Sequence, residues 1–186
     1  MPTIYKNFIM EGMRGTLGSK LVFRVSKGRT IVSMKPKYSD GRVFSEAQLA
    51  QQEAFSDAIL YGQAKKDEEI YKTLATGSKK SAFNIAVADW FHAPEVKDID
   101  LSGWHGAAGE PIRVQALDDV HVKHVIIRIK DGNGDLLEEG SAAETTEKHW
   151  YEYAAVGSYT GTLTVTATAI DLPGNMTDLS LEKTIS

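Results

Sequence analysis

Cysteine is absent from the 186 residues of the chain, and so is any long apolar run. The first absence excludes disulfide bonds, thiolate metal sites and a cysteine nucleophile. The second excludes a transmembrane helix, which needs about 18 consecutive apolar residues. The start of the chain also lacks the apolar segment of a secretory signal, because Lys6, Asn7 and Glu11 interrupt it. We therefore expect synthesis in the cytoplasm, and any extracellular or particle-associated placement would use a route without a cleaved signal.

The composition that remains is ordinary for a folded protein, with 42% hydrophobic and 25% charged residues. It excludes disorder, and the length allows one domain or two small ones. Residues 15–36 read as a β-hairpin with a turn at Gly28, and three helices are expected over 45–64, 67–76 and 81–92. A capping box at Ser45 and Gln48 marks the start of the first helix.

From about residue 97 the apolar pattern changes to a period of two. The expected strands cover residues 99–101, 111–117, 122–130, 136–142, 150–154, 163–170 and 177–185. About seven short strands separated by turns are typical of an immunoglobulin-like β-sandwich, with Trp150 as its expected core aromatic. The fold class is therefore α+β, with a basic hairpin and helical domain over 1–96 and an acidic sandwich over 97–186. Trp90 and Phe91 of the third helix are expected to pack on the hairpin.

Three stretches of the second half carry a resemblance to bacterial immunoglobulin-like modules. They are residues 112–119, residues 122–134, and the strand 164–169 that runs into Asp171-Leu172-Pro173-Gly174-Asn175. Residues 12–96 resemble the start of uncharacterised bacterial proteins, through Lys35-Pro36-Lys37 and the segment 44–51. The first resemblance implies a sandwich with a scaffolding or adhesive role, and the second implies no known chemistry.

Charge is unevenly distributed along the chain, whose net charge is -4. Residues 1–43 carry nine basic and two acidic residues, whereas residues 97–186 carry seven basic and fifteen acidic ones. The basic part, with Arg24 and Arg29 on the hairpin, has three interpretations. It is a site for a polyanion such as nucleic acid, a surface that attracts the acidic part of another copy, or a solvated pair of strands. Nucleic acid is not favoured, because few aromatic residues lie among the basic ones.

Four oxygen-bearing residues at strand ends form a candidate calcium site: Asp118, Asp119, Asp171 and Asn175. The alternative is that these side chains cap turns. The segment Asp131-Gly132-Asn133-Gly134-Asp135 opens like an EF-hand loop but lacks the glycine and glutamate that follow, so it is predicted to be a hairpin turn. The histidines show no zinc-ligand spacing, and no other cofactor is expected.

No catalytic motif is present, since the chain has no G-x-S-x-G elbow and no environment that marks an acid–base carboxylate pair. We therefore expect a non-enzymatic structural or self-assembling subunit of a filament, appendage, virion or injection particle. Its N-terminal arm, residues 1–18 with Ile4, Tyr5, Phe8 and Ile9, would add a strand to a neighbouring copy. The arm's alternative is to fold back as a third strand on its own hairpin. The alternative function is a monomeric binding module for nucleic acid or glycan.

Overall fold

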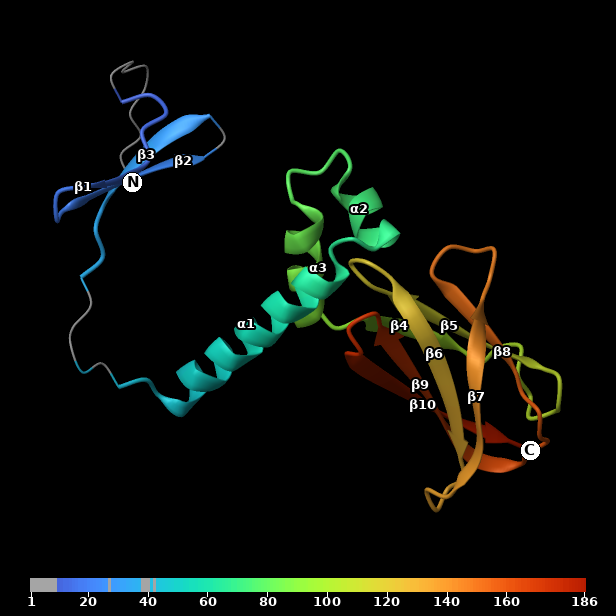
Figure 1. Ribbon diagram of the computed structural model, residues 1–186. Coiled ribbons are helices and arrows are strands. Elements are labelled where there is room, and N and C mark those ends of the chain that lie inside the picture. Colours follow the sequence, from blue (N-terminus) through green and yellow to red (C-terminus); the bar gives the residue numbers. More distant parts are fainter. Residues whose placement is uncertain (1–9, 27, 38–40, 42) are drawn as a thin grey trace. The chain divides into compact units, whose positions relative to one another are not determined.

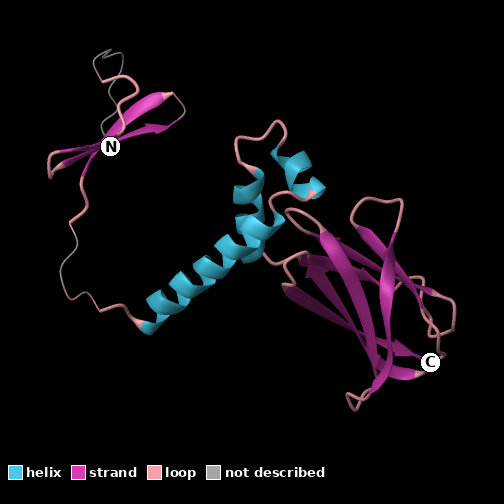
Figure 2. Cartoon of the chain, in the orientation of Figure 1, coloured by secondary structure: helices cyan, strands magenta, loops and turns pink. Residues whose placement is uncertain are grey.

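The structure is a computed structural model that describes residues 10–26, 28–37, 41 and 43–186 (Figure 1). It combines helices and strands, so the α+β class is confirmed (Figure 2). The contacts between residues divide the chain into two compact units, Met1–Gln48 and Leu49–Ser186. This division lies earlier than the expected boundary at residue 96, because the helices share their unit with the strands that follow them.

The first unit contains a three-stranded antiparallel sheet in the order β1-β2-β3. Its strands are β1 (Gly15–Leu17), β2 (Leu21–Ser26) and β3 (Arg29–Met34). Gly28 lies in the turn between β2 and β3 with φ of +73°, a conformation that glycine adopts without strain. The expected hairpin is therefore present. Strand β1 belongs to the expected arm and pairs with β2 of its own chain, as the fold-back alternative requires for these three residues.

Three helices follow: α1 (Glu46–Lys65), α2 (Glu69–Ala75) and α3 (Ala82–Phe91). The capping box is confirmed, because the Gln48 amide donates to Ser45 Oγ at 3.3 Å and the Ser45 amide donates to Gln48 Oε1 at 3.1 Å. Ser81 caps α3 in the same way by accepting from the Asn84 amide at 3.2 Å. Among these helices, none is long and apolar enough to cross a membrane.

The aromatic residues at the end of α3 pack on α1. Trp90 lies 5.3 Å from Tyr61 between ring centroids, and Phe91 stacks on Phe55 at 6.4 Å. The two helices come close at Gly62, where an added Cβ would lie 2.6 Å from a Val87 methyl group. We expected the hairpin to supply the partners of Trp90 and Phe91; their aromatic partners come from α1 instead.

The rest of the second unit is a seven-stranded antiparallel sheet in the order β10-β9-β6-β7-β8-β5-β4. Its strands are β4 (Glu95–Asp100), β5 (Pro111–Leu117), β6 (Val122–Lys130), β7 (Leu136–Glu144), β8 (Trp150–Ala154), β9 (Gly161–Asp171) and β10 (Met176–Ile185). The two end strands, β10 and β4, approach each other, so the sheet folds over and encloses a core. Three expected strands, 111–117, 122–130 and 150–154, are confirmed to the residue.

The core is built from the inward side chains of the central strands, which alternate with outward ones. Its fully buried members include Ile112, Val114, Val125, Ile127, Ile129, Leu163 and Val165. The large aromatic of this core is Trp104, which is fully buried. The expectation for Trp150 was wrong, because Tyr151 and Tyr153 are the inward residues of β8 and Trp150 therefore faces outward. There the guanidinium of Arg113 lies 4.7 Å from the Trp150 ring centroid.

Candidate metal centre

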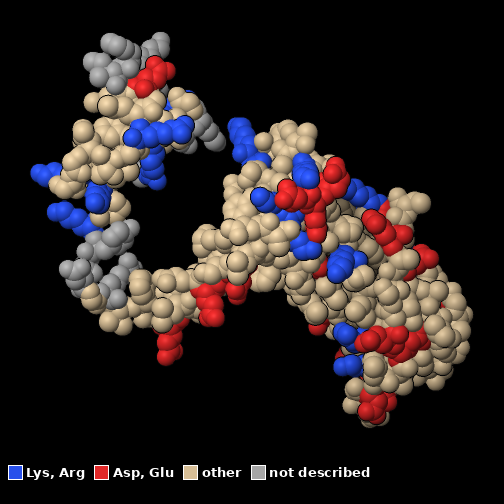
Figure 3. All heavy atoms as spheres, in the orientation of Figure 1, with Lys and Arg blue, Asp and Glu red and all other residues tan. Residues whose placement is uncertain are grey.

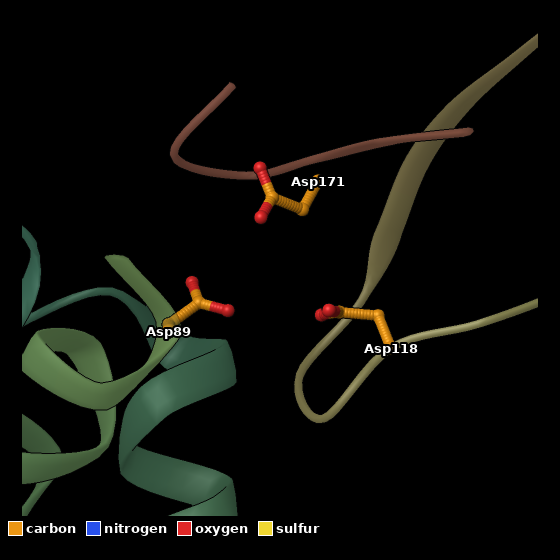
Figure 4. Close-up of side chains that lie close together, drawn as sticks. All are labelled: Asp89, Asp118 and Asp171. Carbon is orange, nitrogen blue, oxygen red and sulfur yellow. The ribbon is translucent and has the colours of Figure 1, made fainter. Parts of the chain in front are cut away.

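Three carboxylates from distant parts of the sequence converge beside α3 (Figure 4). Asp89 lies on α3, Asp118 follows β5, and Asp171 is the last residue of β9. One oxygen from each carboxylate lies within 4.8 Å of those of the other two. Asp89 is 1% exposed and Asp171 is 0% exposed, whereas Asp118 is half-buried. We call Asp89, Asp118 and Asp171 the carboxylate cluster.

Asp171 is fixed by the turn that follows it. Its Oδ1 accepts hydrogen bonds from the backbone amides of Gly174 at 2.7 Å and Asn175 at 2.6 Å. Its Oδ2 accepts from the side-chain amide of Asn175 at 2.7 Å. The same Asn175 nitrogen lies 3.4 Å from the Asp89 carbonyl and 3.3 Å from the Trp90 carbonyl. The turn between β9 and β10 thus orients Asp171 and attaches it to the end of α3.

Asp118 is fixed by an Asx-type turn between β5 and β6. Its Oδ2 accepts from the backbone amides of Val120 at 2.9 Å and His121 at 2.7 Å. Its Oδ1 is buried and has no hydrogen-bond partner. Figure 4 shows this carboxylate pointing toward Asp89. The turn therefore holds the Asp118 carboxylate toward the cluster, with one buried oxygen that lacks a partner.

Asp89 is held from the helical side. Its Oδ2 accepts from the hydroxyl of Tyr71 at 2.6 Å, and Tyr71 lies in turn 2.8 Å from the hydroxyl of Tyr61 on α1. Its Oδ1 is buried and has no partner, like that of Asp118. A buried carboxylate oxygen without a donor is costly, so this pair of oxygens is the least satisfied polar feature of the cluster.

The electrostatics of the cluster disfavour three negative charges. Burial raises the pKa of Asp89 to about 6; the hydrogen bond from Tyr71 opposes this rise, and the charges of Asp118, Asp171 and Asp119 add to it. Burial and the hydrogen bond to Asp89 also raise the pKa of Tyr71. Across the described part of the chain, none of the ion pairs brings a Lys, Arg or His to these three carboxylates. Among the described residues, no cationic side chain therefore pairs with this negative charge.

Of the four residues expected to bind calcium, Asp118 and Asp171 lie in the cluster and Asn175 orients Asp171. Asp119 does not join them, because its exposed Oδ2 pairs with His92 Nδ1 at 2.7 Å. Asp89 was missed. It is the one charged residue within α3, and a lone acid beside an apolar helix face is the signal that could have indicated it.

The other expected sites are placed as follows. Arg24 and Arg29 are exposed on β2 and β3, and Figure 3 shows basic side chains gathered on the first unit. Ile4, Tyr5, Phe8 and Ile9 lie outside the described residues.

The expected turn after β6 is confirmed. The Oδ1 of Asp131 accepts from the amides of Asn133 and Asp135, both at 2.9 Å. These backbone hydrogen bonds, chiefly that from Asp135, lower the pKa of Asp131 against the effect of its desolvation.

An open pocket of about 320 Å³ lies next to the cluster and includes Asp89 and Asp119 in its wall. Leu74, Ile85 and Val120 form apolar parts of the same wall. A site that takes up an ion needs a path from solvent, and this pocket reaches the cluster from the side of α2 and α3.

Comparisons with known proteins give no family for this chain. No family model matches it, and no curated protein matches it. Among solved structures, CopC from Methylosinus trichosporium OB3b is 20% identical with a TM-score of 0.40, over 50% of this chain and 93% of that one. A tetra-tandem repeat in the extending region of a large adhesion protein is 23% identical with a TM-score of 0.35, over 51% of this chain and 24% of that one. An engineered protein is 19% identical with a TM-score of 0.36, over 56% of this chain and 27% of that one. Similarities at this level carry no argument about function.

Proposed function

We propose that the protein is a non-enzymatic structural subunit in which a calcium ion joins the helical segment to an immunoglobulin-like sandwich. The observation that carries the proposal is the carboxylate cluster, with its two buried oxygens that lack partners, Asp89 Oδ1 and Asp118 Oδ1. Removing several charges from water costs several kcal/mol per ion unless an opposite charge is present. A divalent cation would supply that charge and accept both free oxygens as ligands.

The chemistry of the ligands supports calcium. Carboxylate oxygens suit hard cations such as calcium and magnesium, whereas copper and zinc sites are usually built from nitrogen and sulfur. Calcium binds oxygen at about 2.3–2.6 Å, so oxygens across one ion lie up to about 5 Å apart. The 4.8 Å spread of the cluster fits that range.

The burial of the cluster supports a structural role. Asp89 and Asp171 are 1% and 0% exposed and Asp118 is half-buried, so protein atoms surround most of the site. Catalytic metals keep an open position for water or substrate, and structural metals are enclosed by protein ligands. An ion here would fasten α3 to the turns after β5 and β9.

The order of the strands supports the immunoglobulin-like assignment. In that fold, strands A, B, E and D form one sheet and strands C, F and G form the other. Here β4, β5, β8 and the end of β7 form one side, and β6, β9 and β10 form the other. Strand β7 connects the two, because Val125 to Lys130 of β6 pair with its first part and β8 pairs with Ala143 and Glu144.

Calcium titration of the chelator-treated protein tests the proposal. We expect saturable binding by calorimetry and a rise in melting temperature of about 5 °C or more at saturating calcium. Asp89→Asn and Asp118→Asn should each abolish the rise. Asp119→Asn is the matched control, since Asp119 is next in sequence but lies outside the cluster, and it should keep the rise. Absence of binding in the wild type, or equal loss in Asp119→Asn, would contradict the proposal.

Self-assembly is the second part of the proposed role, and the exposed basic residues Arg24 and Arg29 on the first unit favour it. Opposite charges on the two ends of the chain would attract copies head to tail, and salt would weaken that attraction. Light scattering at low and high salt tests this proposal. We expect higher-order species of the wild type at low salt, and fewer of them for the Arg24→Glu/Arg29→Glu variant and for a variant that lacks residues 2–11. A wild type that stays monomeric at low salt would favour the monomeric binding module instead.

A further inference from the structure

A chain of hydrogen bonds connects the carboxylate cluster to the first helix. It runs from Asp89 Oδ2 to the Tyr71 hydroxyl at 2.6 Å and from there to the Tyr61 hydroxyl at 2.8 Å. The three residues lie on α3, α2 and α1 respectively, so one polar path crosses all three helices. Tyr71 is fully buried, so its hydroxyl is satisfied by Asp89 and Tyr61.

The packing of α1 depends strongly on a few contacts. Its buried residues are Ala58 and Gly62, both small, while Phe55 and Leu60 are 51% and 63% exposed. Helices in proteins gain most of their stability from burying an apolar face, and this helix buries little of one. Together with the Phe55–Phe91 stack and the close approach at Gly62, the contacts of Tyr61 with Trp90 and Tyr71 hold α1 to its neighbours.

We propose that Tyr71 is a positioning residue for the cation, and that occupancy of the carboxylate cluster controls how firmly α1 and α2 pack on α3. This inference rests on the proposed function, since it concerns the same calcium ion. Tyr71 donates to Oδ2 and leaves Asp89 Oδ1 buried without a hydrogen-bond partner, in a carboxylate that lies beside Asp118 and Asp171. Carboxylates that bind metals are commonly held in this way, and loss of the supporting group typically weakens metal binding by about 10–100-fold.

The coupling must work in both directions. If the ion favours the arrangement in which Asp89, Tyr71 and Tyr61 are connected, then that arrangement favours the ion by the same factor. The ion fixes the position of the Asp89 side chain, which holds the Tyr71 hydroxyl. Tyr71 in turn holds Tyr61, the residue of α1 that contacts Trp90. Calcium should therefore protect the backbone amides of α1 and α2 from exchange with solvent, although neither helix contributes a residue to the carboxylate cluster.

Two measurements on the full-length protein test this inference. The first is the calcium affinity of Tyr71→Phe, which removes the hydroxyl and keeps the ring; we expect affinity to fall about 10-fold or more. Tyr153→Phe is the matched control, because Tyr153 is also buried and its hydroxyl donates to Glu138, which is outside the carboxylate cluster, and its affinity should stay within about 2-fold of wild type. The second is hydrogen exchange of α1 and α2 with and without calcium, where the ion should slow exchange in the wild type but not in Tyr61→Phe.

The outcomes separate this inference from the proposed function. A wild type that binds no calcium removes both. A wild type that binds calcium while exchange in α1 and α2 stays unchanged overturns the coupling and leaves the calcium site intact. A Tyr71→Phe protein that is folded by circular dichroism and binds calcium as tightly as wild type overturns the positioning role. Weaker binding by Tyr71→Phe together with calcium-dependent protection of α1 supports it.

Discussion

The side-chain amide nitrogen of Asn175 lies 2.7 Å from Oδ2 of Asp171 and also within reach of the carbonyls at the end of α3. One side chain thus both orients a member of the carboxylate cluster and attaches a sheet turn to a helix. The two residues are the first and last of the Asp171-Leu172-Pro173-Gly174-Asn175 segment. The segment therefore forms the turn between β9 and β10, and through Asn175 it also contacts the end of α3.

We predict that Asn175→Ala destabilises the protein by about 2 kcal/mol, because it leaves the acceptors of a partly buried donor unpaired. Urea denaturation of the calcium-free protein measures the change. Asn133→Ala is the matched control. The side-chain amide of Asn133 also donates to an aspartate of a hairpin turn, Asp131, but this hydrogen bond is exposed to solvent. Its effect should stay within about 0.5 kcal/mol. Equal effects of the two substitutions would show that Asn175 does not hold α3.

Asp89→Asn is predicted to stabilise the calcium-free protein at neutral pH while abolishing its response to calcium. Burial raises the pKa of Asp89 to about 6, so at neutral pH the folded state holds an ionised carboxylate that it disfavours. The amide has similar shape and no charge, and a gain of about 1–3 kcal/mol is expected. Chemical denaturation with and without calcium measures both effects. Destabilisation of the calcium-free protein would mean that the charge of Asp89 is already compensated.

The parts of the fold that could be predicted from the sequence are those where local pattern and burial agree. Strands β5 and β8 alternate throughout and β6 alternates from Val125 onward, and the predicted bounds of all three match the structure. Strand β4 begins at Glu95, ahead of the expected start, because a bulge between Val96 and Asp98 breaks the alternation that would have marked it. Trp104 lies in an irregular loop, where no periodicity indicates burial.

The carboxylate cluster could be predicted only in part for a related reason. Asp118 and Asp171 sit at the ends of β5 and β9, and strand ends from the two sides of a sandwich meet at its pole. Asp89 reaches them through the packing of α3, which brings together residues that are far apart in the sequence. Helical periodicity shows on which face of α3 Asp89 lies, but not which strands pack against that face. The third residue of the cluster could therefore be identified only from the tertiary structure.

Trp104 is predicted to be more important for stability than Trp150, although both are large aromatics of the same sheet unit. Trp104→Ala should cost about 3–5 kcal/mol because it empties a fully buried volume. Trp150→Ala removes an outward ring that packs on Arg113, and should cost about 1 kcal/mol or less. Denaturation of the two variants side by side measures the difference. A larger effect for Trp150→Ala would contradict the assignment of Trp104 to the core and of Trp150 to the surface.

The last prediction concerns Glu138, whose carboxylate accepts four hydrogen bonds near the end of the sheet. The donors are the hydroxyls of Tyr153 at 2.5 Å and Tyr159 at 2.7 Å, and the backbone amides of Val156 at 2.7 Å and Gly157 at 2.9 Å. Burial alone would raise the pKa of Glu138, but these hydrogen bonds outweigh it and lower the pKa below the usual 4.5. A carboxylate with a lowered pKa stabilises the folded state above its unfolded pKa, and this contribution is lost as the pH falls through the folded value.

We therefore expect Glu138→Gln to cost about 2 kcal/mol at neutral pH, because the neutral amide is a weaker acceptor and cannot accept from all four donors. The difference from wild type should shrink as the pH falls through the lowered pKa of Glu138, because the wild-type carboxylate then becomes protonated and loses the same interactions. Denaturation across an acid pH series measures this. Glu139→Gln is the matched control, since the exposed Glu139 forms a surface ion pair with Arg128, and its effect should be small at every pH. A Glu138→Gln deficit that persists unchanged into acid would show that shape, rather than charge, holds the loop after β8.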